Sequence, residues 1–568
     1  MSINSALHIG RTALLTSQTA LQVAGDNMAN AATRGFHRRT IHLAPSQGHH
    51  LGAGQFIGQG VSLKSIRREI DGALQIRYRA AISREHASYV DQQFLTAMET
   101  LQNELTDNDV STMLSSFFNS FSELANSPSD NAVRGVVIQK GQSLATRLAA
   151  MRNDYNTVLT QINQSLDVSV TKVNDILGQV TQLNTQIAAA ESSGGGGAAS
   201  LRDHRDLLLD ELAQYLDITV VEQPNGAADV LVGSIPIVLG GESRGIKIQS
   251  DMVNGKAVLS LRVAADGTHL SANAGSIGSL LNQRAQTVEP MIKALDDFTS
   301  QLIFQVNRVH SQGQGLKGFE SVSGTYKAHS PSVNLNSPES KLPFKIQNGS
   351  FYIHVTNKET GVRTTHEISV NGNTMSLNDL VAEINTVVGV PHVTAAVGVE
   401  GGGNVLKLTA DAGYEFSFSD DTSGALAALG INTFFTGHNA STIGVNQRLI
   451  DDPGLLAAGG GHVEGSTDTA ILLANLQDVA FSELGGKSLR EFWRNAASNL
   501  AVKTGAANAS ADTSRLVRES LGAQIQSVSG VSLDEEAINL LTFQRQFQAA
   551  ARFIGVIDET MQTLIALV

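Results

Sequence analysis

The sequence contains no cysteine, and this absence excludes disulfide bonds, thiolate metal sites and cysteine nucleophiles. It also has no run of about 18 apolar residues that could span a bilayer. The N-terminus lacks the charged start, the apolar stretch and the cleavage site of a secretory signal. These rules predict no membrane insertion and a cytoplasmic protein, unless the chain leaves the cell by a route that uses no cleaved signal.

Basic residues are outnumbered in this chain. The 40 Lys and Arg residues stand against 53 Asp and Glu residues, which gives a formal net charge of -13. An acidic chain is repelled by phosphate backbones, so we expect no nucleic-acid partner. The length of 568 residues predicts three or four domains rather than a single core.

The two ends of the chain share an apolar pattern with alternating steps of four and three residues, which is typical of coiled-coil helices. At the N-terminus, large residues occupy one seam of the heptad and small residues the other. At the C-terminus, the pattern reaches the last residue and predicts a helix about 50 Å long over residues 534–568. The N-terminal positions are Ile3, Leu7, Gly10, Leu14, Ser17, Leu21, Ala24 and Met28, and the C-terminal positions are Leu540, Phe543, Phe547, Ala550, Ile554, Ile557, Met561, Leu564 and Val568.

A narrow stripe of this period is buried best against a partner helix. We therefore expect the terminal helices to pair with each other or with neighbouring subunits. The alternative is that each stripe belongs to an ordinary amphipathic helix that packs on its own domain. Because short isolated helices are marginal in water, a further hypothesis is that the ends are disordered in the monomer and fold on assembly.

The middle of the chain alternates between helical and β patterns. A helical stretch covers about residues 72–192, stops at a glycine loop at Gly194–Gly197 and resumes at 201–216, where Arg202, Asp203, Arg205 and Asp206 are predicted on a polar face. Short strands follow at 218–263, a helix at 277–310, and a second β-rich stretch at 330–440 with one helix at 377–388. From about residue 468 the chain reads as helix, with loops near Gly485 and Gly505.

This order predicts a mainly α protein with inserted β domains: a discontinuous helical core with long coiled-coil-like helices, paired N- and C-terminal helices and two β-rich insertions. We expect four domains. The predicted ranges are 1–35 with 530–568 for the terminal coiled-coil domain, 36–216 with 272–320 and 450–529 for the helical core, 217–271 for a small β-rich insertion, and 321–449 for a β-rich outer insertion.

Two glycine motifs match known catalytic or cofactor-binding patterns, but the secondary structure expected around them differs from what those patterns require. Gly241-Glu242-Ser243-Arg244-Gly245 matches a nucleophile elbow, but the residues after it read as a strand where that motif needs a helix. The triplet at Gly313, Gly315 and Gly318 matches a dinucleotide fingerprint, but it follows a helix instead of a strand. The histidines show no spacing suited to a metal. We expect no catalytic, cofactor-binding or metal site.

Two motifs flank the terminal helices. The first is Asp26–Asn30 followed by Thr33, Gly35, Phe36 and Arg38. In it, Asn30 can end the first helix and Gly35 can supply a tight turn. The motif resembles the N-terminal signature of flagellar rod, hook and hook-associated proteins, although Asp26 stands where the family usually has Asn and Phe36 where Tyr is common.

The second motif is Ser529-Gly530-Val531-Ser532-Leu533-Asp534-Glu535-Glu536, which leads into the last helix. It is similar to the more specific signature of the hook-associated protein 1 family, the proteins of the hook-filament junction. The segment 275–281 before a long helix resembles the same family. The order helix, β, helix, β, helix fits that family along nearly the whole chain.

The resemblance implies a secreted, extracellular structural subunit of the bacterial flagellum, exported by the type III apparatus and located at the hook-filament junction. It implies no enzymatic activity and no cofactor. The implied partners are other copies of the chain, the hook protein, a second junction protein with the filament, and an export chaperone that binds the C-terminal region. The alternatives are a hook or distal-rod subunit, or an enzyme, which would be a serine hydrolase that uses Ser243 or a wall-remodelling hydrolase.

From the stripes and the resemblance together, we expect a set of residues to form the assembly interface. They lie on the terminal helices and in the two motifs. The set comprises Ile3, Leu7, Leu14, Leu21, Asn27, Met28, Asn30, Gly35, Phe36, Arg38, Leu533, Leu540, Phe543, Phe547, Ile554, Ile557, Met561 and Leu564.

Overall fold

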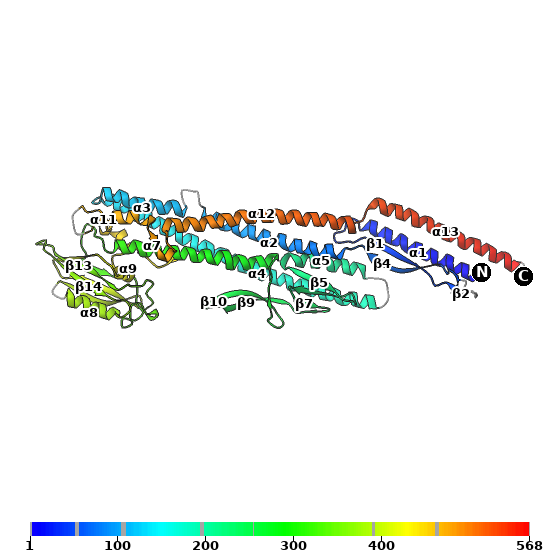
Figure 1. The fold of residues 1–568 in the computed structure, drawn as a ribbon, viewed down its shortest axis with the longest axis horizontal. Coiled ribbons are helices and arrows are strands. Elements are labelled where there is room, and N and C mark those ends of the chain that lie inside the picture. Colours follow the sequence, from blue (N-terminus) through cyan, green and yellow to red (C-terminus); the bar gives the residue numbers. More distant parts are fainter. Residues whose placement is uncertain are drawn as a thin grey trace. The chain divides into compact units, whose positions relative to one another are not determined.

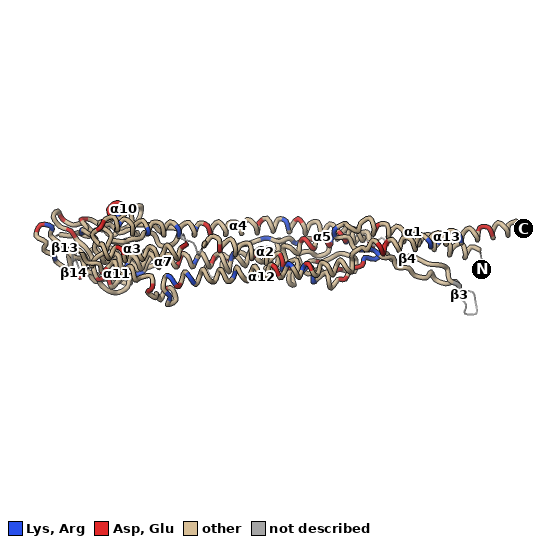
Figure 2. The backbone as a smooth tube through the Cα atoms, turned by 90° about the horizontal axis from the view of Figure 1, so that it is seen from above, with Lys and Arg blue, Asp and Glu red and all other residues tan. Residues whose placement is uncertain are grey.

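The structure is a computed structural model that describes residues 3–50, 56–103, 109–192, 198–253, 255–388, 392–460 and 465–566. The chain forms two compact units, each built from separate segments (Figures 1 and 2). Unit 1 comprises Met1–Gln93, Ile162–Ala285 and Ala506–Val568, and unit 2 comprises Phe94–Gln161 and Gln286–Gly505. The predicted glycine loop at 194–197 and the last heptad position, Val568, lie outside the described residues.

Unit 1 carries both ends of the chain. Its helices, three of which continue into unit 2, are α1 (Ile3–Ala29), α2 (Gly72–Gln102), α4 (Asn131–Ser192), α5 (Ala199–Tyr215), α6 (Gly275–Gln283), α12 (Leu489–Ser529) and α13 (Leu533–Ala566). Its strands are β1 (Arg39–Pro45), β2 (His49–His50), β3 (Phe56–Ile57), β4 (Val61–Arg68), β5 (Ile218–Glu222), β6 (Ala228–Val232), β7 (Ile235–Leu239), β8 (Glu242–Ser243), β9 (Ile246–Val253), β10 (Lys256–Val263) and β11 (His269–Leu270).

The terminal helices α1 and α13 lie side by side and run antiparallel, so both termini are at the same end of the pair (Figure 1). This confirms the predicted pairing of the chain ends. The small seam of α1 is the buried one, because Gly10, Ser17 and Ala24 are all buried. A Cβ atom added at Gly10 would lie 2.7 Å from Ile554 Cγ1, so only glycine allows the two helices to approach this closely.

Residues 39–68 hold strands that the sequence analysis did not predict. Strands β1 and β4 form an antiparallel ladder from Arg39 opposite Arg68 to Pro45 opposite Val61, with an irregularity after His42. The ladder has no buried residue in either strand, and Leu43 and Leu63 both face solvent. Its alternation of apolar and polar residues is therefore weak, because little of either face enters a core.

The first β insertion follows its prediction. Strands β5 to β8 form a four-stranded antiparallel sheet in chain order, and β9 to β11 form a three-stranded sheet with β10 at its centre. Ser243 is exposed in β8, where it pairs with Val238 of β7, and β9 follows it after a turn. The glycine-serine motif is thus a hairpin segment followed by a strand, which confirms that it lacks the context of a nucleophile elbow.

Helix α12 runs without interruption through Gly505, so the predicted loop at that residue is wrong. A Cβ atom added at Gly505 would find nothing within 4 Å, so no close packing demands a glycine there. A single exposed glycine costs a helix about 1 kcal/mol, which the rest of a 41-residue helix offsets.

Unit 2 combines helices with the second β-rich stretch. Its own helices are α3 (Val110–Asn126), α7 (Glu289–His310), α8 (Leu377–Val387), α9 (Ala425–Leu429), α10 (Gln447–Asp451) and α11 (Asp468–Asn475), and a π-helical segment, Arg284–Val288, precedes α7. Its strands are β12 (Ser321–Ser323), β13 (Gly349–Asn357), β14 (Arg363–Val370), β15 (Val393–Glu400), β16 (Gly403–Ala410), β17 (Tyr414–Ser419), β18 (Phe435–Thr436), β19 (Gly444–Val445), β20 (Ala480–Phe481) and β21 (Lys487–Ser488).

The predicted strands and helix of the second insertion are present. One sheet has the order β14-β13-β17 and a second the order β12-β16-β15, all antiparallel. Phe351, Ile353 and Val355 of β13 are buried, which is the period of two on which the prediction rested. The fold is therefore mainly helical with two β-rich insertions, as expected.

A buried histidine fixes one polar contact in the core of unit 2. His310 Nε2 accepts a hydrogen bond from the backbone N–H of Ala457 at 3.0 Å, so Nδ1 carries the proton and donates to the carbonyl of Asn432 at 2.9 Å. The pKa of His310 is lowered to about 4, chiefly by burial and to a smaller extent by Arg134, while the bond to Asn432 acts in the opposite direction. The imidazole is therefore neutral at pH 7.

We expect the free energy of unfolding of unit 2 to fall as the pH drops from 6.5 to about 4. In this window the unfolded chain protonates this histidine and the folded chain does not, so low pH favours unfolding by about 3 kcal/mol. The free energy of unfolding at each pH can be measured by urea unfolding. The probe is the fluorescence of Trp493, the single tryptophan of the chain, which is fully buried in unit 2. His310→Gln should flatten the pH dependence, and the exposed control His438→Gln should keep it; equal slopes would contradict the assignment.

The glycine contact between α1 and α13 gives a matched pair of variants. Gly10→Val places side-chain atoms where Ile554 and Phe553 lie, whereas Gly25→Val on the same helix meets nothing within 4 Å. We expect Gly10→Val to separate the helices and to lose their far-UV circular dichroism, because isolated helices are marginal in water. Gly25→Val should match the parent spectrum. Identical spectra for both variants would contradict the close packing.

Candidate functional site

The end of α1 is shaped by the residues of the N-terminal motif. Asn30 Nδ2 donates to the backbone oxygen of Asp26 at 3.0 Å and to its Oδ1 at 2.9 Å, which satisfies acceptors at the helix end. Gly35 has φ +78°, and an added Cβ atom would lie 2.4 Å from Leu207 Cγ. The turn therefore requires glycine, and it carries the chain from α1 into β1.

Asn27 and Arg38 join this turn to the start of α13. Asn27 Nδ2 donates to Glu536 Oε2 at 3.2 Å and to the backbone oxygen of Arg39 at 2.9 Å, while Asn27 Oδ1 accepts from the Arg39 N–H at 3.0 Å. Arg38 Nε and Nη2 each lie 2.8 Å from Glu536 Oε1, and Arg38 Nη1 lies 2.8 Å from Glu535 Oε2. We call Asn27, Arg38, Arg39, Glu535 and Glu536 the terminal clamp.

A backbone contact completes the terminal clamp, because the Arg38 N–H donates to the carbonyl of Ser529 at 2.9 Å. Glu536 is only 2% exposed, and a buried carboxylate needs partners to remain charged. Burial alone would lower the pKa of Arg38, but Glu536 and Glu535 outweigh it and raise that pKa. The guanidinium of Arg38 is therefore held in its charged form, and its contacts with Glu535 and Glu536 join the two chain ends.

A second network of ion pairs lies next to the turn between α1 and β1. Figure 2 shows acidic and basic residues close together near β4 and α5. Arg68 Nη1 donates to Asp203 Oδ1 at 2.9 Å and to Asp206 Oδ2 at 2.7 Å. Arg79 of α2 donates to Asp206 at 3.0 Å and to Asp210 at 2.8 Å. His37 Nδ1 lies 2.8 Å from Asp203, and Arg39 also contacts Asp26 and Asp203. Because His37 and Arg39 are both held by these contacts, the backbone at Arg38 between them is held in place as well.

The pKa values of two carboxyl groups in this network, those of Asp206 and Asp210, are shifted in opposite directions. Burial acts to raise the pKa of Asp206, but Arg79 and Arg68 together lower it below its usual value. Burial raises the pKa of Asp210 and the neighbouring Asp206 adds to the rise, while Arg79 and His37 oppose it. Asp206 therefore has two arginine partners, Arg68 and Arg79, whereas the arginine paired with Asp210 is Arg79.

The structure places the predicted interface residues in three environments. Asn27 and Ile557 are buried, whereas Leu533 and Leu564 are exposed. The remaining members are partly buried, either along the contact of α1 with α13 or in the turn before β1: Ile3, Leu7, Leu14, Leu21, Met28, Asn30, Gly35, Phe36, Arg38, Leu540, Phe543, Phe547, Ile554 and Met561. Their role in assembly remains a prediction.

Sequence analysis missed the partners that make this site. Glu536 opens α13 among other acids, where a favourable interaction with the helix dipole explains it without a buried partner. The polar face predicted for α5 is also wrong in part, because Asp203, Arg205 and Asp206 are buried. One sequence feature could have indicated these buried ion pairs. Arg and Asp alternate on α5, and β4 and α2 carry the arginines Arg68 and Arg79 that pair with these acids.

The contacts of this arrangement are hydrogen bonds and ion pairs that join distant parts of the chain. Across the ranges that the structure describes, no group of three or more His, Cys, Asp or Glu residues could hold a metal ion. The helices within those ranges also contain no segment with the length and apolar character of a membrane span. The chemistry that is present joins residues about 500 positions apart in the sequence, Asn27 and Glu536.

Comparisons with known proteins agree with this description. A family model described as the flagellar hook-associated protein FlgK helical domain matches residues 95–323, and one described as the flagellar basal body rod FlgEFG protein C-terminal matches residues 524–567. Proteins named flagellar hook-associated protein 1 are 25% identical in Escherichia coli, covering 99% of this chain and 100% of theirs, and 26% identical in Bacillus subtilis, covering 98% and 97%.

A solved structure of the flagellar hook junction protein FlgK from Burkholderia pseudomallei has a TM-score of 0.49 and 17% identity to this chain, covering 80% of it and all of that structure. The chain is therefore similar over nearly its whole length to proteins named flagellar hook-associated protein 1, and residues 95–323 match the FlgK helical domain.

Proposed function

We propose that this protein is the subunit that forms the junction between the flagellar hook and filament, and that it assembles with copies of itself through α1 and α13. The observation that carries the proposal is similarity over nearly the whole chain to proteins named flagellar hook-associated protein 1. The N-terminal motif is shared more widely among flagellar rod and hook proteins. The match to the helical domain over residues 95–323 favours the junction protein over a hook or distal-rod subunit.

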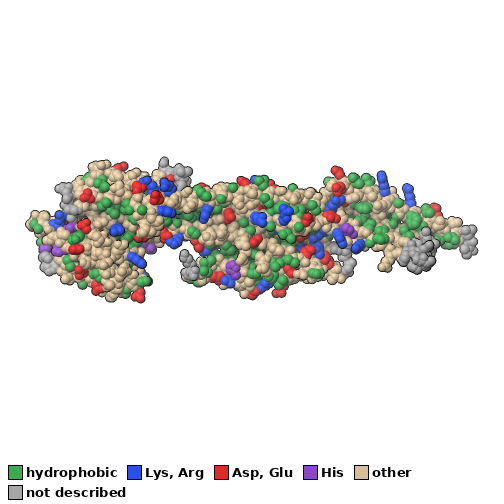
Figure 3. Space-filling model, viewed as in Figure 1, with side chains coloured by type: hydrophobic (Ala, Val, Ile, Leu, Met, Phe, Trp, Pro, Cys, Tyr) green, Lys and Arg blue, Asp and Glu red, His purple; other side chains and the backbone are tan. Residues whose placement is uncertain are grey.

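The surface of α13 supports assembly through the chain ends. The face of α13 turned away from α1 exposes Ile538 and Val556, at 64% and 58%, together with Leu541. Apolar side chains and projecting basic side chains occur over this part of unit 1 in Figure 3. Contiguous apolar exposure on a helix favours contact with another helix. We therefore infer that the seam facing α1 joins the ends within one copy and that the outer face joins neighbouring copies.

Further partners and the location follow from the same proposal. We expect the hook protein on one side of the assembly, a second junction protein with the filament on the other, and an export chaperone on the C-terminal region before assembly. The protein would be secreted and extracellular, and would have no enzymatic activity. Ser243→Ala should accordingly remove no activity.

Immunogold electron microscopy of intact flagella tests the location. An antibody raised against residues 330–440, in the second β-rich stretch, would label the protein in cells that make the native chain. Label confined to a narrow band between hook and filament is the expected result. Label along the hook would favour the hook-subunit alternative, and label confined to the cell wall or the cytoplasm would overturn the proposal.

The terminal clamp predicts a difference between two neighbouring glutamates. Glu536→Ala removes the carboxylate that binds both Asn27 and Arg38, and we expect a loss of about 3 kcal/mol in the stability of the clamp and failure to incorporate. Glu535 is 61% exposed, so Glu535→Ala should cost less than about 1 kcal/mol and incorporate normally. Immunoblots of purified hook-filament preparations measure incorporation, with secreted monomer as the control for export. Equal incorporation of the two variants would contradict a role for the clamp.

The apolar seam predicts a second loss of assembly. A charge at the partly buried Phe547 or Ile554 would lie unpaired between α1 and α13, and Leu14 and Leu21 should respond in the same way. We expect Ile554→Asp, like truncation of residues 540–568, to abolish incorporation while Trp493 fluorescence remains native. Gln548→Asp, on the exposed surface of the same helix, serves as the control for an added charge. Normal junctions built from the Ile554→Asp protein would show that the seam is dispensable.

A further inference from the structure

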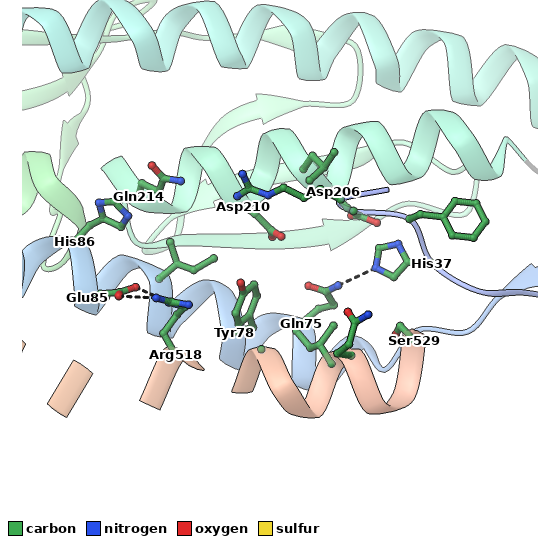
Figure 4. Close-up of a pocket in the computed structure, with 18 of the residues that line it drawn as sticks. His37, Gln75, Tyr78, Glu85, His86, Asp206, Asp210, Gln214, Arg518 and Ser529 are labelled. Atoms are coloured by element: carbon green, nitrogen blue, oxygen red, sulfur yellow. Dashed lines mark hydrogen bonds and ion pairs between the residues drawn. The ribbon is translucent and has the colours of Figure 1, made fainter. Parts of the chain in front are cut away.

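An open cavity of about 610 Å³ lies in unit 1 beside the terminal clamp. Its walls come from the turn at 34–37, from α2, from α5 and from the C-terminal part of α12 (Figure 4). Glu85 and Arg518 close one side with a two-pronged ion pair, at 2.8 and 3.0 Å. The guanidinium of Arg518 is therefore already paired, and other parts of the cavity wall carry hydrogen-bond acceptors.

Gln75 is the clearest of these acceptors. It is 8% exposed, and its Nε2 lies 3.2 Å from Nε2 of His37. Its Oε1 is buried and has no hydrogen-bond partner within the described part of the chain. In Figure 4 this oxygen lies on the side of the amide that faces Tyr78. A buried carbonyl oxygen without a donor is costly, so a donor entering the cavity would be bound.

Asp210 supplies a second acceptor on the opposite wall. Its Oδ1 accepts from Arg79 Nε at 2.8 Å, and its side chain is 24% exposed, so the carboxylate is reachable from the cavity. Burial raises the pKa of Asp210, and Arg79 and His37 together do not offset the rise. Tyr78 and Tyr89 line the same cavity with aromatic rings. Two acceptors beside aromatic faces suit a guanidinium, which donates in a plane and stacks on rings.

The chain itself carries suitable cations. Arg545 and Arg552 are exposed on α13, seven residues apart on the face that also bears Ile538 and Leu541. No ion pair or hydrogen bond joins either guanidinium to a residue that the structure describes. Spacing by one heptad places both on the outer face of the helix, which is available to a neighbouring copy.

We propose that this cavity receives the guanidinium of Arg545 or Arg552 from a second copy of the chain. The guanidinium donates to Gln75 Oε1 and to the Asp210 carboxylate, and the apolar residues of α13 cover the rim. This inference rests on the proposed function, because it specifies one contact through which neighbouring copies assemble. Arg34 of the same chain also lines the cavity and is the competing cation.

The absence of cysteine from the sequence makes the contact testable by cross-linking in assembled flagella. Cells would make only a chain with Gln214→Cys in the cavity wall and Ala549→Cys between the two arginines of α13. After mild oxidation we expect a ladder of disulfide-linked multimers on non-reducing gels. The control chain combines Ala549→Cys with Met252→Cys, at an exposed position on β9. The ladder from the Gln214→Cys and Ala549→Cys chain should be about tenfold stronger than that of the control, because the proposed contact holds only those two cysteines at high effective concentration.

Removal of each cation then identifies the occupant. In the Gln214→Cys and Ala549→Cys chain, Arg545→Gln with Arg552→Gln should abolish most of the ladder, and Arg34→Gln should leave it intact. A ladder that survives loss of Arg545 and Arg552, or one that is lost with Arg34 alone, overturns the inference. Immunogold label at the hook-filament boundary without a ladder overturns the inference alone. Absence of label from that boundary overturns the proposed function, and the inference falls with it.

Discussion

The arrangement of unit 1 depends on one buried carboxylate, that of Glu536. A charge with 2% exposure is tolerated only where donors surround it, and the donors come from Asn27 and Arg38, at the other end of the sequence. The requirement is mutual, because burial of the Arg38 guanidinium also needs the glutamate. The two chain ends are therefore joined by a charged contact with defined geometry as well as by an apolar stripe.

The apolar stripe and the terminal clamp act on different parts of the same helix pair. Near the clamp, hydrogen bonds fix the direction in which α13 leaves Ser529. Farther along, Gly10 brings the backbones together against Ile554. One face of α13 packs closely on the small seam of α1. The opposite face of α13 is exposed and carries apolar and basic side chains. A helix with one face bound inside its own chain and another left exposed is suited to a subunit that must both fold and assemble.

Local patterns predicted the parts of this structure whose burial follows a period. The heptads predicted that α1 and α13 pair, and the alternation around Phe351 and Ile353 predicted β13. Local pattern failed for the exposed β1 and β4 ladder, because strands that bury neither face carry little alternation. It also failed for Glu536 and Asp203, because a buried acid is distinguished from an exposed one only by its partners. Those partners lie more than 100 residues away, and no local window contains them.

Hydrogen exchange of the α1 amides is the most direct test that the chain ends hold each other. It would be measured by mass spectrometry on the full chain and on a chain that stops at Ser532, before α13. Without α13, we predict that α1 amides exchange at close to the rate of an unfolded peptide, while α4 and α5 keep their protection. Unchanged protection of α1 in the shortened chain would contradict the account, because it would mean that α1 is held by the rest of unit 1.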